Sequence, residues 1–349
     1  MTDVVEPGGG SAAGDHVHRA VLHLLTGAWR TQALHAMAEL RIADHLARSA
    51  ATTRRLAELT GTDPDALARL LSYLVGLGML RRTEGGRFAL TDAGALLRDD
   101  HPDSMRGLAL MYGGPSYQAW GSLLYSLRTG RDAFSEVFGA PLFAYLAAHP
   151  DLGGAFQRSM SAGTSFFGAV PELFDFGRAR VVADIGGGKG SLLAEVLRAV
   201  DSVRGVLFEA PHVIEDARRH LGELGLLDRC TLVSGDFFAE VPVTADVYLL
   251  SRVLHDWDDD GCLALLRAVA RAMPGHARLL VLERLMPEGD EDRLALAWNM
   301  QMLVMLPGAR ERTLAEYREL LAGAGLTLRT SHELPLDVSL LTAGRTPDA

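Results

Sequence analysis

The chain has two patterns of apolar and polar positions, and the pattern changes near residue 178. In the first half, apolar side chains such as Val21, Leu24 and Leu34 recur at the three- and four-residue spacing of helices. In the second half, short apolar runs alternate with amphipathic stretches of helical period. We therefore expect a mainly helical region followed by an α/β unit.

Residues 56–90 predict two short helices followed by two short strands. The first helix ends at Gly61, and Asp63-Pro64 begins the second, because Asp caps a helix and Pro fits its first turn. The strands flank a turn at Gly85-Gly86, which completes the outline of a winged helix. The second helix offers mainly Arg69 to a DNA groove, so we interpret this region as a packing or dimerisation domain.

Composition narrows the possible partners. The formal net charge of −10 opposes binding to nucleic acid, because affinity for phosphates depends on Lys and Arg. The only cysteines, Cys230 and Cys262, lack the spacing of a zinc site and are too few for a disulfide scaffold. No apolar run approaches the roughly 20 residues of a membrane helix, and no signal pattern opens the chain. We expect a cytoplasmic protein that binds neither nucleic acid nor membranes.

Five apolar runs in the second half predict the strands of a parallel sheet with helices on both faces. These runs are Val181–Ile185, Val203–Phe208, Thr231–Val233, Val247–Leu250 and Leu279–Leu282. Ligands of such sheets bind at the carboxyl ends of the strands. The residues at those ends are, in order, Gly186–Gly190, Glu209, Asp236-Phe237, His255 and Glu283. The chemistry is therefore expected along this edge.

The glycine turn has the pattern G-x-G-x-G, which matches neither the dinucleotide fingerprint nor the P-loop. With Asp184 just before them, Gly186 and Gly188 still let a ligand approach the backbone closely. Glu209 stands where a carboxylate binds ribose hydroxyls, and Asp236-Phe237 is placed to bind an adenine and cover its ring. Together these residues favour an adenosine cofactor without a pyrophosphate, and S-adenosylmethionine is the commonest of these.

Four motifs follow one another along the chain: Val181–Gly190, Gly235–Phe238, Arg252–Asp259 and Gly308–Thr313. In this order they resemble the small-molecule O-methyltransferases related to caffeate and acetylserotonin O-methyltransferases, in particular the bacterial members that modify secondary metabolites. The resemblance extends from about residue 17 to residue 345. It implies a Rossmann-like class I methyltransferase domain with a mostly parallel seven-stranded sheet, and an N-terminal helical, winged-helix dimerisation domain. It also implies S-adenosylmethionine as cofactor and a homodimer.

The resemblance and the pattern of apolar positions together predict four segments. Residues 1–15, rich in glycine, form a disordered tail, and residues 16–100 form the winged-helix-like dimerisation domain. Residues 101–177 form a helical linker and substrate-pocket region that is rich in large apolar side chains. Residues 178–349 form the S-adenosylmethionine-binding catalytic domain.

The resemblance assigns the role of general base to His255 and that of its flanking acids to Glu283 and Glu311. An imidazole with an ordinary pKa near 6.5 suits proton removal at neutral pH. An acid bonded to one ring nitrogen fixes the tautomer and stabilises the imidazolium. A phenol becomes a good nucleophile once its proton has left, so the protein has mainly to align the reacting atoms. The expected acceptor is the phenolic hydroxyl of an aromatic small molecule.

The resemblance also implies which residues contact the two ligands. The substrate-binding positions are Phe156, Met160, Asp256, Met302 and Leu306. Leu306 stands where lignin-pathway members place an asparagine, which argues against the plant substrates. Ser251 stands where many members have a lysine, so Ser251 or Arg252 is expected to meet the cofactor.

The acidic run Asp256–Asp260 suggests a divalent metal, as in the catechol-type methyltransferases. We expect no metal, because Asp258 or Asp259 is better placed to cap the next helix. Other functions stay open at this point: N- or C-methylation of a heteroaromatic metabolite, and a winged-helix regulator without catalysis. The predicted histidine and glutamates favour catalysis over the regulator. The glycine spacing disfavours an NAD-linked oxidoreductase.

Overall fold

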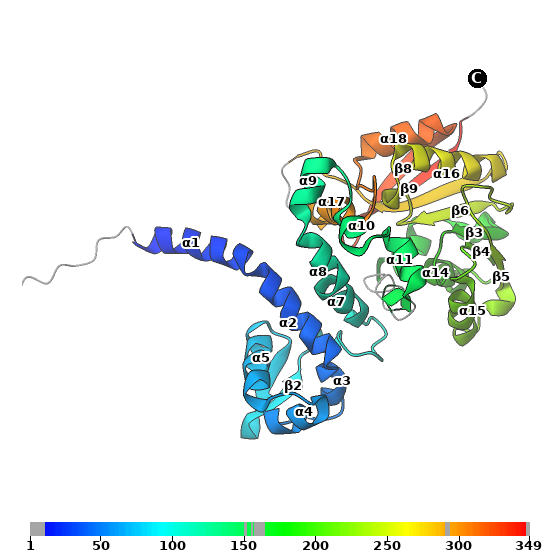
Figure 1. Cartoon of the computed structure of the whole chain (residues 1–349). Helices are drawn as coiled ribbons and strands as arrows, with labels where there is room; N and C mark the ends of the chain where they lie inside the picture. Colours follow the sequence, from blue (N-terminus) through cyan, green and yellow to red (C-terminus); the bar gives the residue numbers. More distant parts are fainter. Residues whose placement is uncertain (1–10, 150–151, 155, 157–164, 290–293, 347–349) are drawn as a thin grey trace, which may run out of the picture. The chain divides into compact units, whose positions relative to one another are not determined.

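The computed structural model describes residues 11–149, 152–154, 156, 165–289 and 294–346 (Figure 1). The chain divides into two compact units, residues 1–117 and 118–349. The first unit extends past residue 100 because α7 (Arg106–Gly113) packs on α2 (Gly27–Glu39): Gln32 Nε2 donates a hydrogen bond to the Gly113 carbonyl at 2.7 Å.

The first unit is helical with one small hairpin. Its elements are α1 (Ser11–Leu25), α2 (Gly27–Glu39), α3 (Ile42–Leu46), α4 (Thr53–Thr60), α5 (Pro64–Gly76), β1 (Leu80–Thr83), β2 (Arg87–Leu90), α6 (Asp92–Ala95) and α7 (Arg106–Gly113). Helix α1 begins at Ser11, so residues 11–15 are helical and do not belong to the expected disordered tail. The hydrophobic core of the unit includes Met37, Leu71 and Phe88, which come from α2, α5 and β2.

The predicted winged-helix outline is present in this unit. Helix α4 ends at Gly61, which has a φ of +65°. The Asp63 carboxylate caps α5 by accepting a hydrogen bond from the N–H of Ala66 at 2.8 Å. Strands β1 and β2 pair antiparallel around the predicted glycine turn. Local capping chemistry therefore shapes this region as the sequence indicates.

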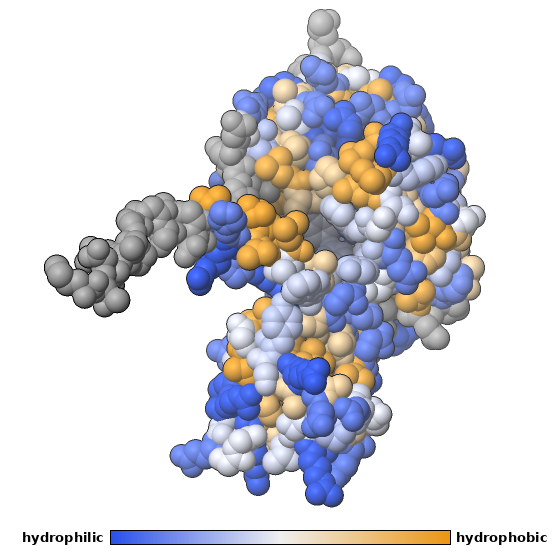
Figure 2. All heavy atoms as spheres, turned by 60° about the vertical axis from the view of Figure 1, so that its left-hand side comes forward, coloured by the Kyte–Doolittle hydropathy of each residue, from blue (hydrophilic) through white to orange (hydrophobic). Residues whose placement is uncertain are grey.

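Helices α1 and α2 leave large apolar side chains exposed to solvent. Trp29 is 66% exposed and Leu24 is 81% exposed. The others on the same two helices are Val17, Val21, Leu22 and Leu25. Figure 2 shows apolar groups of this kind at the molecular surface, coloured orange. So many neighbouring apolar side chains at a surface are typical of an interface.

The second unit contains a seven-stranded sheet in the order β5-β4-β3-β6-β7-β9-β8. The strands are β3 (Val181–Ile185), β4 (Arg204–Glu209), β5 (Cys230–Ser234), β6 (Val247–Ser251), β7 (Arg278–Arg284), β8 (Leu326–Leu334) and β9 (Val338–Arg345). Strands β3 to β7 are parallel to one another, and β9 runs antiparallel between β7 and β8. The predicted mostly parallel, seven-stranded sheet is confirmed.

Helices cover both faces of this sheet (Figure 1). They are α14 (Ser191–Ala199) and α15 (Ile214–Glu223) on one face, and α16 (Asp259–Ala272) and α18 (Leu314–Gly323) on the other. Side chains of β7 alternate between the two faces: Leu280 and Leu282 pack with α14, whereas Leu279 and Val281 pack with α16. Because the period is two, Glu283 follows Val281 on the α16 face.

A separate apolar cluster is formed by α8 (Pro115–Trp120), α9 (Leu123–Thr129), α10 (Ala133–Phe138), α11 (Leu142–Ala148) and α17 (Leu294–Met305). Phe134 of α10 and Met305 of α17 are both buried in this cluster. Helix α13 (Val170–Leu173) instead packs with α14 against the sheet, where Val170 is buried. Short 3-10 helices connect several elements: Glu84–Gly86, Ser165–Ala169, Phe176–Arg178, Leu227–Arg229 and Leu254–Asp256.

Two further expectations concern bilayers and disulfides. Among the described helices, none combines the length and the hydropathy required to cross a bilayer. Cys230 and Cys262 are both buried free thiols. Burial raises the pKa of the Cys262 thiol to about 12, which keeps it protonated and unreactive.

Candidate active site

The loop after β6 brings His255 against three carboxylates. Its Nδ1 lies 3.0 Å from Glu311 Oε1 and 3.5 Å from Glu283 Oε2, and its Nε2 lies 3.4 Å from Asp256 Oδ1. His255 is 6% exposed, and Glu283 and Glu311 are buried with it. Residues predicted from two motifs and from one strand end therefore meet in one cluster, which we call the histidine cluster.

The fold holds each member of this cluster through the backbone. His255 lies in the 3-10 helix Leu254–Asp256, directly after β6. Glu283 ends β7, and its Oε1 accepts hydrogen bonds from the N–H groups of Val253 at 3.0 Å and Leu254 at 2.8 Å. The carboxylate of β7 therefore fixes the start of the loop that carries the histidine.

The charges of the cluster control its protonation. Burial alone lowers the pKa of His255, but the carboxylates of Glu283, Glu311 and Asp256 outweigh it and raise this pKa to about 10. Burial raises the pKa of Glu283 to about 7 and that of Asp256 to about 6, against the opposing effect of the imidazole. Such groups titrate as a unit. The carboxylates therefore hold the pKa of His255 above the ordinary value of an imidazole.

The glycine turn after β3 encloses a second group of predicted residues. Gly186 and Gly188 have φ values of +66° and +59°, a conformation that favours glycine. A Cβ at Gly187 would overlap the Asp184 carboxylate. Glu209 ends β4, and its Oε2 accepts a hydrogen bond from the N–H of Gly188 at 2.8 Å. The turn and the predicted ribose-binding acid are therefore in direct contact.

Asp184 is the strongest sign that this turn binds a ligand. Its side chain is fully buried, and within the described residues neither of its oxygens has a hydrogen-bond partner of good geometry, although the backbone N–H of Leu193 is close enough to lower its pKa. Burial, and then the nearby Glu209, raise its pKa to about 7. A buried carboxylate without a partner beside glycine backbone fits a ligand that carries hydroxyl and amino groups. S-adenosylmethionine has both.

The aromatic pair after β5 lies beside the same turn. Phe237 Cε1 would be 3.6 Å from a Cβ placed on Gly186. Its ring and that of Phe238 pack edge-on against Trp257, with centroid distances of 6.1 Å and 4.7 Å. Asp236 is exposed, and its carboxylate accepts a hydrogen bond from the N–H of Phe238 at 2.8 Å. Phe237 therefore lies beside the glycine turn, and Asp236 lies at the solvent side.

Ser251 ends β6, and Arg252 follows it just before the 3-10 helix that carries His255. The Ser251 hydroxyl oxygen is buried and, among the described residues, has no hydrogen-bond partner. Arg252 has a left-handed backbone with a φ of +54°, which is uncommon for a residue other than glycine. Its guanidinium carbon lies 5.6 Å from the ring centroid of Phe167. Backbone strain of this kind often occurs at ligand sites.

Comparison with known proteins identifies the class of site that this geometry builds. Residues 120–327 match the O-methyltransferase domain family, and residues 22–100 match the O-methyltransferase dimerisation domain. The chain belongs to the O-methyltransferase family. The methyltransferase is 48% identical to 3-amino-4-hydroxybenzoate 4-O-methyltransferase of Streptomyces cremeus, over 95% of this chain and 91% of the relative. This finding supports an enzyme over a regulator or an oxidoreductase.

Two further relatives define the cofactor and the breadth of the family. The structure of human N-acetylserotonin methyltransferase in complex with S-adenosylmethionine superimposes with a TM-score of 0.88, at 26% identity, over 97% of this chain and 99% of the human one. Phenazine-1-carboxylate N-methyltransferase of Pseudomonas aeruginosa is 32% identical over 94% of this chain and 97% of its own length. The protein is an S-adenosylmethionine-dependent methyltransferase of the family that modifies aromatic secondary metabolites.

The predicted substrate-binding residues of this methyltransferase meet only in part. Phe156, Met302 and Leu306 belong to one apolar cluster around α17, where Met302 and Leu306 are each only 5% exposed. The ring of Phe156 lies 6.2 Å from that of Phe143. Asp256 is separate from this cluster and lies beside His255. Met160 lies outside the described residues.

Among the described residues, the group of side chains whose geometry could hold a metal ion is the histidine cluster, not the acidic run Asp256–Asp260. As expected, Asp258 caps α16 by accepting a hydrogen bond from the N–H of Gly261 at 2.8 Å. Asp259 is bonded to two arginines of the last motif. Instead, the ligand atoms of His255, Glu283 and Glu311 all lie within 4.8 Å of one another, which is close enough to hold a cation. The same contacts are those of a base with two orienting acids.

Two residues at the site were missed by the sequence analysis. Asn299 of α17 accepts a hydrogen bond from the N–H of Glu311 through Oδ1 at 3.1 Å. No spacing signal connects these two, because they come from different elements. Arg312 is fully buried and bonds to the loop of His255. Its place next to Glu311 in the fourth motif could have indicated it.

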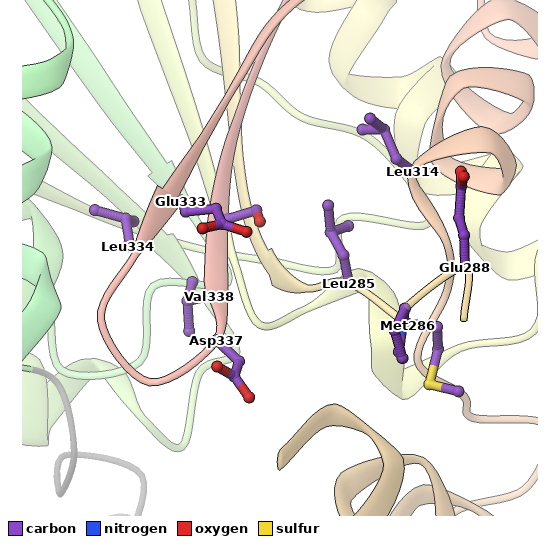
Figure 3. A pocket seen from close by; sticks show the side chains of 10 residues that line it. Leu285, Met286, Glu288, Leu314, Glu333, Leu334, Asp337 and Val338 are labelled. Carbon is purple, nitrogen blue, oxygen red and sulfur yellow. The ribbon is translucent and has the colours of Figure 1, made fainter. Parts of the chain in front are cut away.

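A cavity of about 370 Å³ lies near this site, beyond the end of β7. Figure 3 shows Leu285 and Met286 on one side of it and the β8–β9 hairpin on the other. Three acids, Glu288, Glu333 and Asp337, contribute to its lining. Asp337 Oδ2 accepts the N–H of Leu294 at 2.8 Å and so holds the start of α17. None of the predicted site residues lines this cavity in the described part of the chain.

Proposed function

We propose that this enzyme transfers the methyl group of S-adenosylmethionine to a phenolic hydroxyl of an aromatic secondary metabolite, with His255 as general base. The proposal depends chiefly on one observation, the 3.0 Å contact between His255 Nδ1 and Glu311 Oε1 within a buried cluster of carboxylates. With Nδ1–H bonded to Glu311, Nε2 is the atom that exchanges protons. Asp256, 3.4 Å from Nε2, marks the side from which an acceptor hydroxyl approaches.

The raised pKa of His255 suits a phenol. A phenolic hydroxyl has a pKa of about 10, so its proton transfer to an imidazole of ordinary pKa near 6.5 costs about 5 kcal/mol. With the pKa of His255 raised to about 10, the two groups match and this cost largely disappears. The carboxylates stabilise the imidazolium as it forms. The raised pKa also means that only a small fraction of His255 is deprotonated at neutral pH. We therefore expect turnover to increase as the pH rises.

The cofactor supplies an electrophilic methyl group on a sulfonium. Asp184, Glu209 and the glycine turn are the residues that hold it, with Phe237 beside them. Ser251 and Arg252 lie at the end of β6, which pairs with β3 and leads into the 3-10 helix of His255. What remains for the protein is to keep the acceptor oxygen in line with the methyl group and to exclude water.

The test is an acceptor panel. The full chain is incubated with labelled S-adenosylmethionine and phenolic, hydroxybenzoate, polyketide and heteroaromatic acceptors, and mass spectrometry locates the methyl group. Methylation of a phenolic oxygen, unaffected by a chelator, is the expected result. Transfer only to ring nitrogen or carbon, or turnover that requires added metal, would contradict the proposal.

N-methylation is the second candidate, favoured by the relative named as an N-methyltransferase. A neutral heteroaromatic nitrogen has a free lone pair and needs no general base. Turnover on such an acceptor would therefore survive the loss of the imidazole, whereas turnover on a phenol would not. A His255→Ala variant assayed on both acceptor classes separates the two functions.

We further propose a homodimer, formed through the exposed apolar face of α1 and α2. The matched dimerisation domain supports it, as do Leu24 and Trp29, which are largely exposed in the single chain. Burying such side chains stabilises an interface by about 25 cal/mol for each Å² removed from water.

A further inference from the structure

One buried arginine, Arg312, bonds to both ends of the loop that carries His255. Its side chain is 0% exposed. A guanidinium has five N–H donors, and here five hydrogen bonds use them all. Nη1 donates to the carbonyls of Leu254 (3.1 Å) and Arg310 (3.4 Å), Nη2 donates to the carbonyl of Trp257 (2.8 Å) and to Asp259 Oδ1 (2.8 Å), and Nε donates to Asp259 Oδ1 (2.9 Å).

The two loop carbonyls stand on either side of the histidine. Leu254 precedes His255, and Trp257 follows the 3-10 helix in which it lies. The backbone N–H of Arg310 adds a third link by donating to the His255 carbonyl at 3.0 Å. Glu311, between the two arginines, bonds the imidazole itself. The segment 310–312 therefore holds both the backbone and the ring of the histidine.

We propose that Arg312 is a positioning residue for the methyl transfer, which fixes the loop so that the His255 ring meets Glu311 and faces the acceptor. The inference rests on the proposed role of His255 as the base. Arg312 acts only through the loop, since all five of its donors are directed to the loop, to its own segment and to Asp259. A guanidinium also keeps its proton throughout the neutral range, so it takes no part in proton transfer.

The geometry predicts which replacements fail. Lysine has a single ammonium with three donors and no planar fork, so it cannot reproduce the five hydrogen bonds of the guanidinium. Methionine fills a similar volume and donates nothing. Cys262 Sγ lies 3.0 Å from the Leu254 carbonyl, so this oxygen keeps one partner in either variant. That second donor favours retention of the fold when the arginine is replaced.

Arg310 offers a matched control. Its side chain is also an arginine on the same segment and also bonds Asp259, but its other partner is Glu316, outside the loop. Arg310→Met therefore removes a comparable ion pair without touching the carbonyls around His255. The backbone N–H that Arg310 donates to His255 is unchanged by this substitution.

The experiment compares the wild type with Arg312→Lys, Arg312→Met and Arg310→Met as full-length enzymes. Proteins labelled with ¹⁵N-histidine report the His255 ring by NMR, with a His255→Asn variant to assign its signals. Calorimetry measures the affinity for S-adenosylhomocysteine, and turnover uses the acceptor that the wild type methylates best. The NMR and calorimetric readouts do not depend on the acceptor.

We expect both Arg312 variants to shift or broaden the His255 Nδ1 signal and to lose about 100-fold in kcat, with cofactor affinity within threefold of wild type. Arg310→Met should retain the signal and turnover within twofold. If Arg312→Met fails to fold, Arg312→Lys decides the question. An unchanged His255 signal and kcat in Arg312→Lys would overturn the inference. Failure of the wild type to methylate any phenol would instead refute the proposed function, while the NMR comparison still tests the positioning.

Discussion

At the scale of single residues, the His255 imidazole carries most of the proposed chemistry. Replacing it by alanine removes the base but leaves the glycine turn and Glu209 intact. We expect His255→Ala to lose about 10²- to 10⁴-fold in kcat on a phenolic acceptor, the usual contribution of a general base. Calorimetry should find S-adenosylmethionine bound with nearly unchanged affinity. Near-normal turnover in this variant would exclude the assigned role.

The three carboxylates around His255 lead to a prediction about pH. They raise its pKa to about 10, above the value of 6.5 in the unfolded chain. This interaction therefore stabilises the folded state fully below pH 6.5 and is lost as the pH rises through 10. In Glu311→Gln one carboxylate is gone, so the pKa of His255 should fall, as an NMR titration of the labelled ring would show. Turnover should fall as well, because the ring loses its orienting partner. A pKa that stays unchanged would contradict this account.

Asp184 leads to a prediction of the same sign in a lower pH range. Burial raises its pKa from 3.8 to about 7, so the folded, cofactor-free enzyme binds more protons than the unfolded chain between these values. Its stability therefore falls as the pH rises across that window, by a few kcal/mol at most. Asp184→Asn does not titrate. Thermal unfolding should show the variant gaining stability relative to wild type between pH 5 and pH 8. If the stability difference between variant and wild type is the same at both pH values, the prediction is wrong.

At the scale of elements, the strands were the most predictable part. Each of the five predicted runs coincides with a strand within one or two residues, because buried parallel strands are continuous apolar runs. The β8–β9 hairpin was implied only by the family resemblance. Strand β8 is largely exposed in its middle, so its sequence is polar and carries no comparable signal. Surface strands gain their pairing from neighbours rather than from their own composition.

The site was predictable for a related reason. The carboxyl ends of parallel strands share one edge, so His255 and Glu283 could be placed on that edge from the pattern of strands, and the resemblance paired them. Glu311 and Asn299 could not, because they reach the site through a loop and a helix whose paths depend on packing. The apolar cluster of α17 is similar: a methionine at helical spacing looks the same in a core and in a pocket.

The glycine turn is the element whose backbone most restricts its sequence. A Cβ at Gly187 would overlap Asp184 and lie 2.6 Å from Leu207 Cδ1. We expect Gly187→Ala to weaken S-adenosylmethionine binding at least tenfold in calorimetry and to lower the melting temperature. Gly222→Ala is the control, since a Cβ there meets nothing within 4 Å on an ordinary helical backbone. Equal behaviour of the two variants would show that the turn tolerates side chains.

At the scale of the whole molecule, the prediction concerns assembly. Introducing charge at Leu24 and Trp29 should convert the proposed dimer to monomers, because a charge buried in an apolar interface is costly. Leu59→Asp is the control, an exposed leucine on α4. Sedimentation at micromolar concentration measures the mass of each. A Leu24→Asp/Trp29→Asp variant that stays dimeric would locate the interface elsewhere.

The position of β9 has a consequence for the order in which this molecule is made. Strand β9 pairs with β7 along its whole length, from Arg278 opposite Gly344 to Arg284 opposite Val338. Until the ribosome has passed residue 345, the strand that carries Glu283 has one unpaired edge, and exposed strand edges promote aggregation. A nascent chain therefore cannot complete this side of the catalytic sheet before β9 is made, and a chain arrested before residue 338 leaves the edge of β7 exposed.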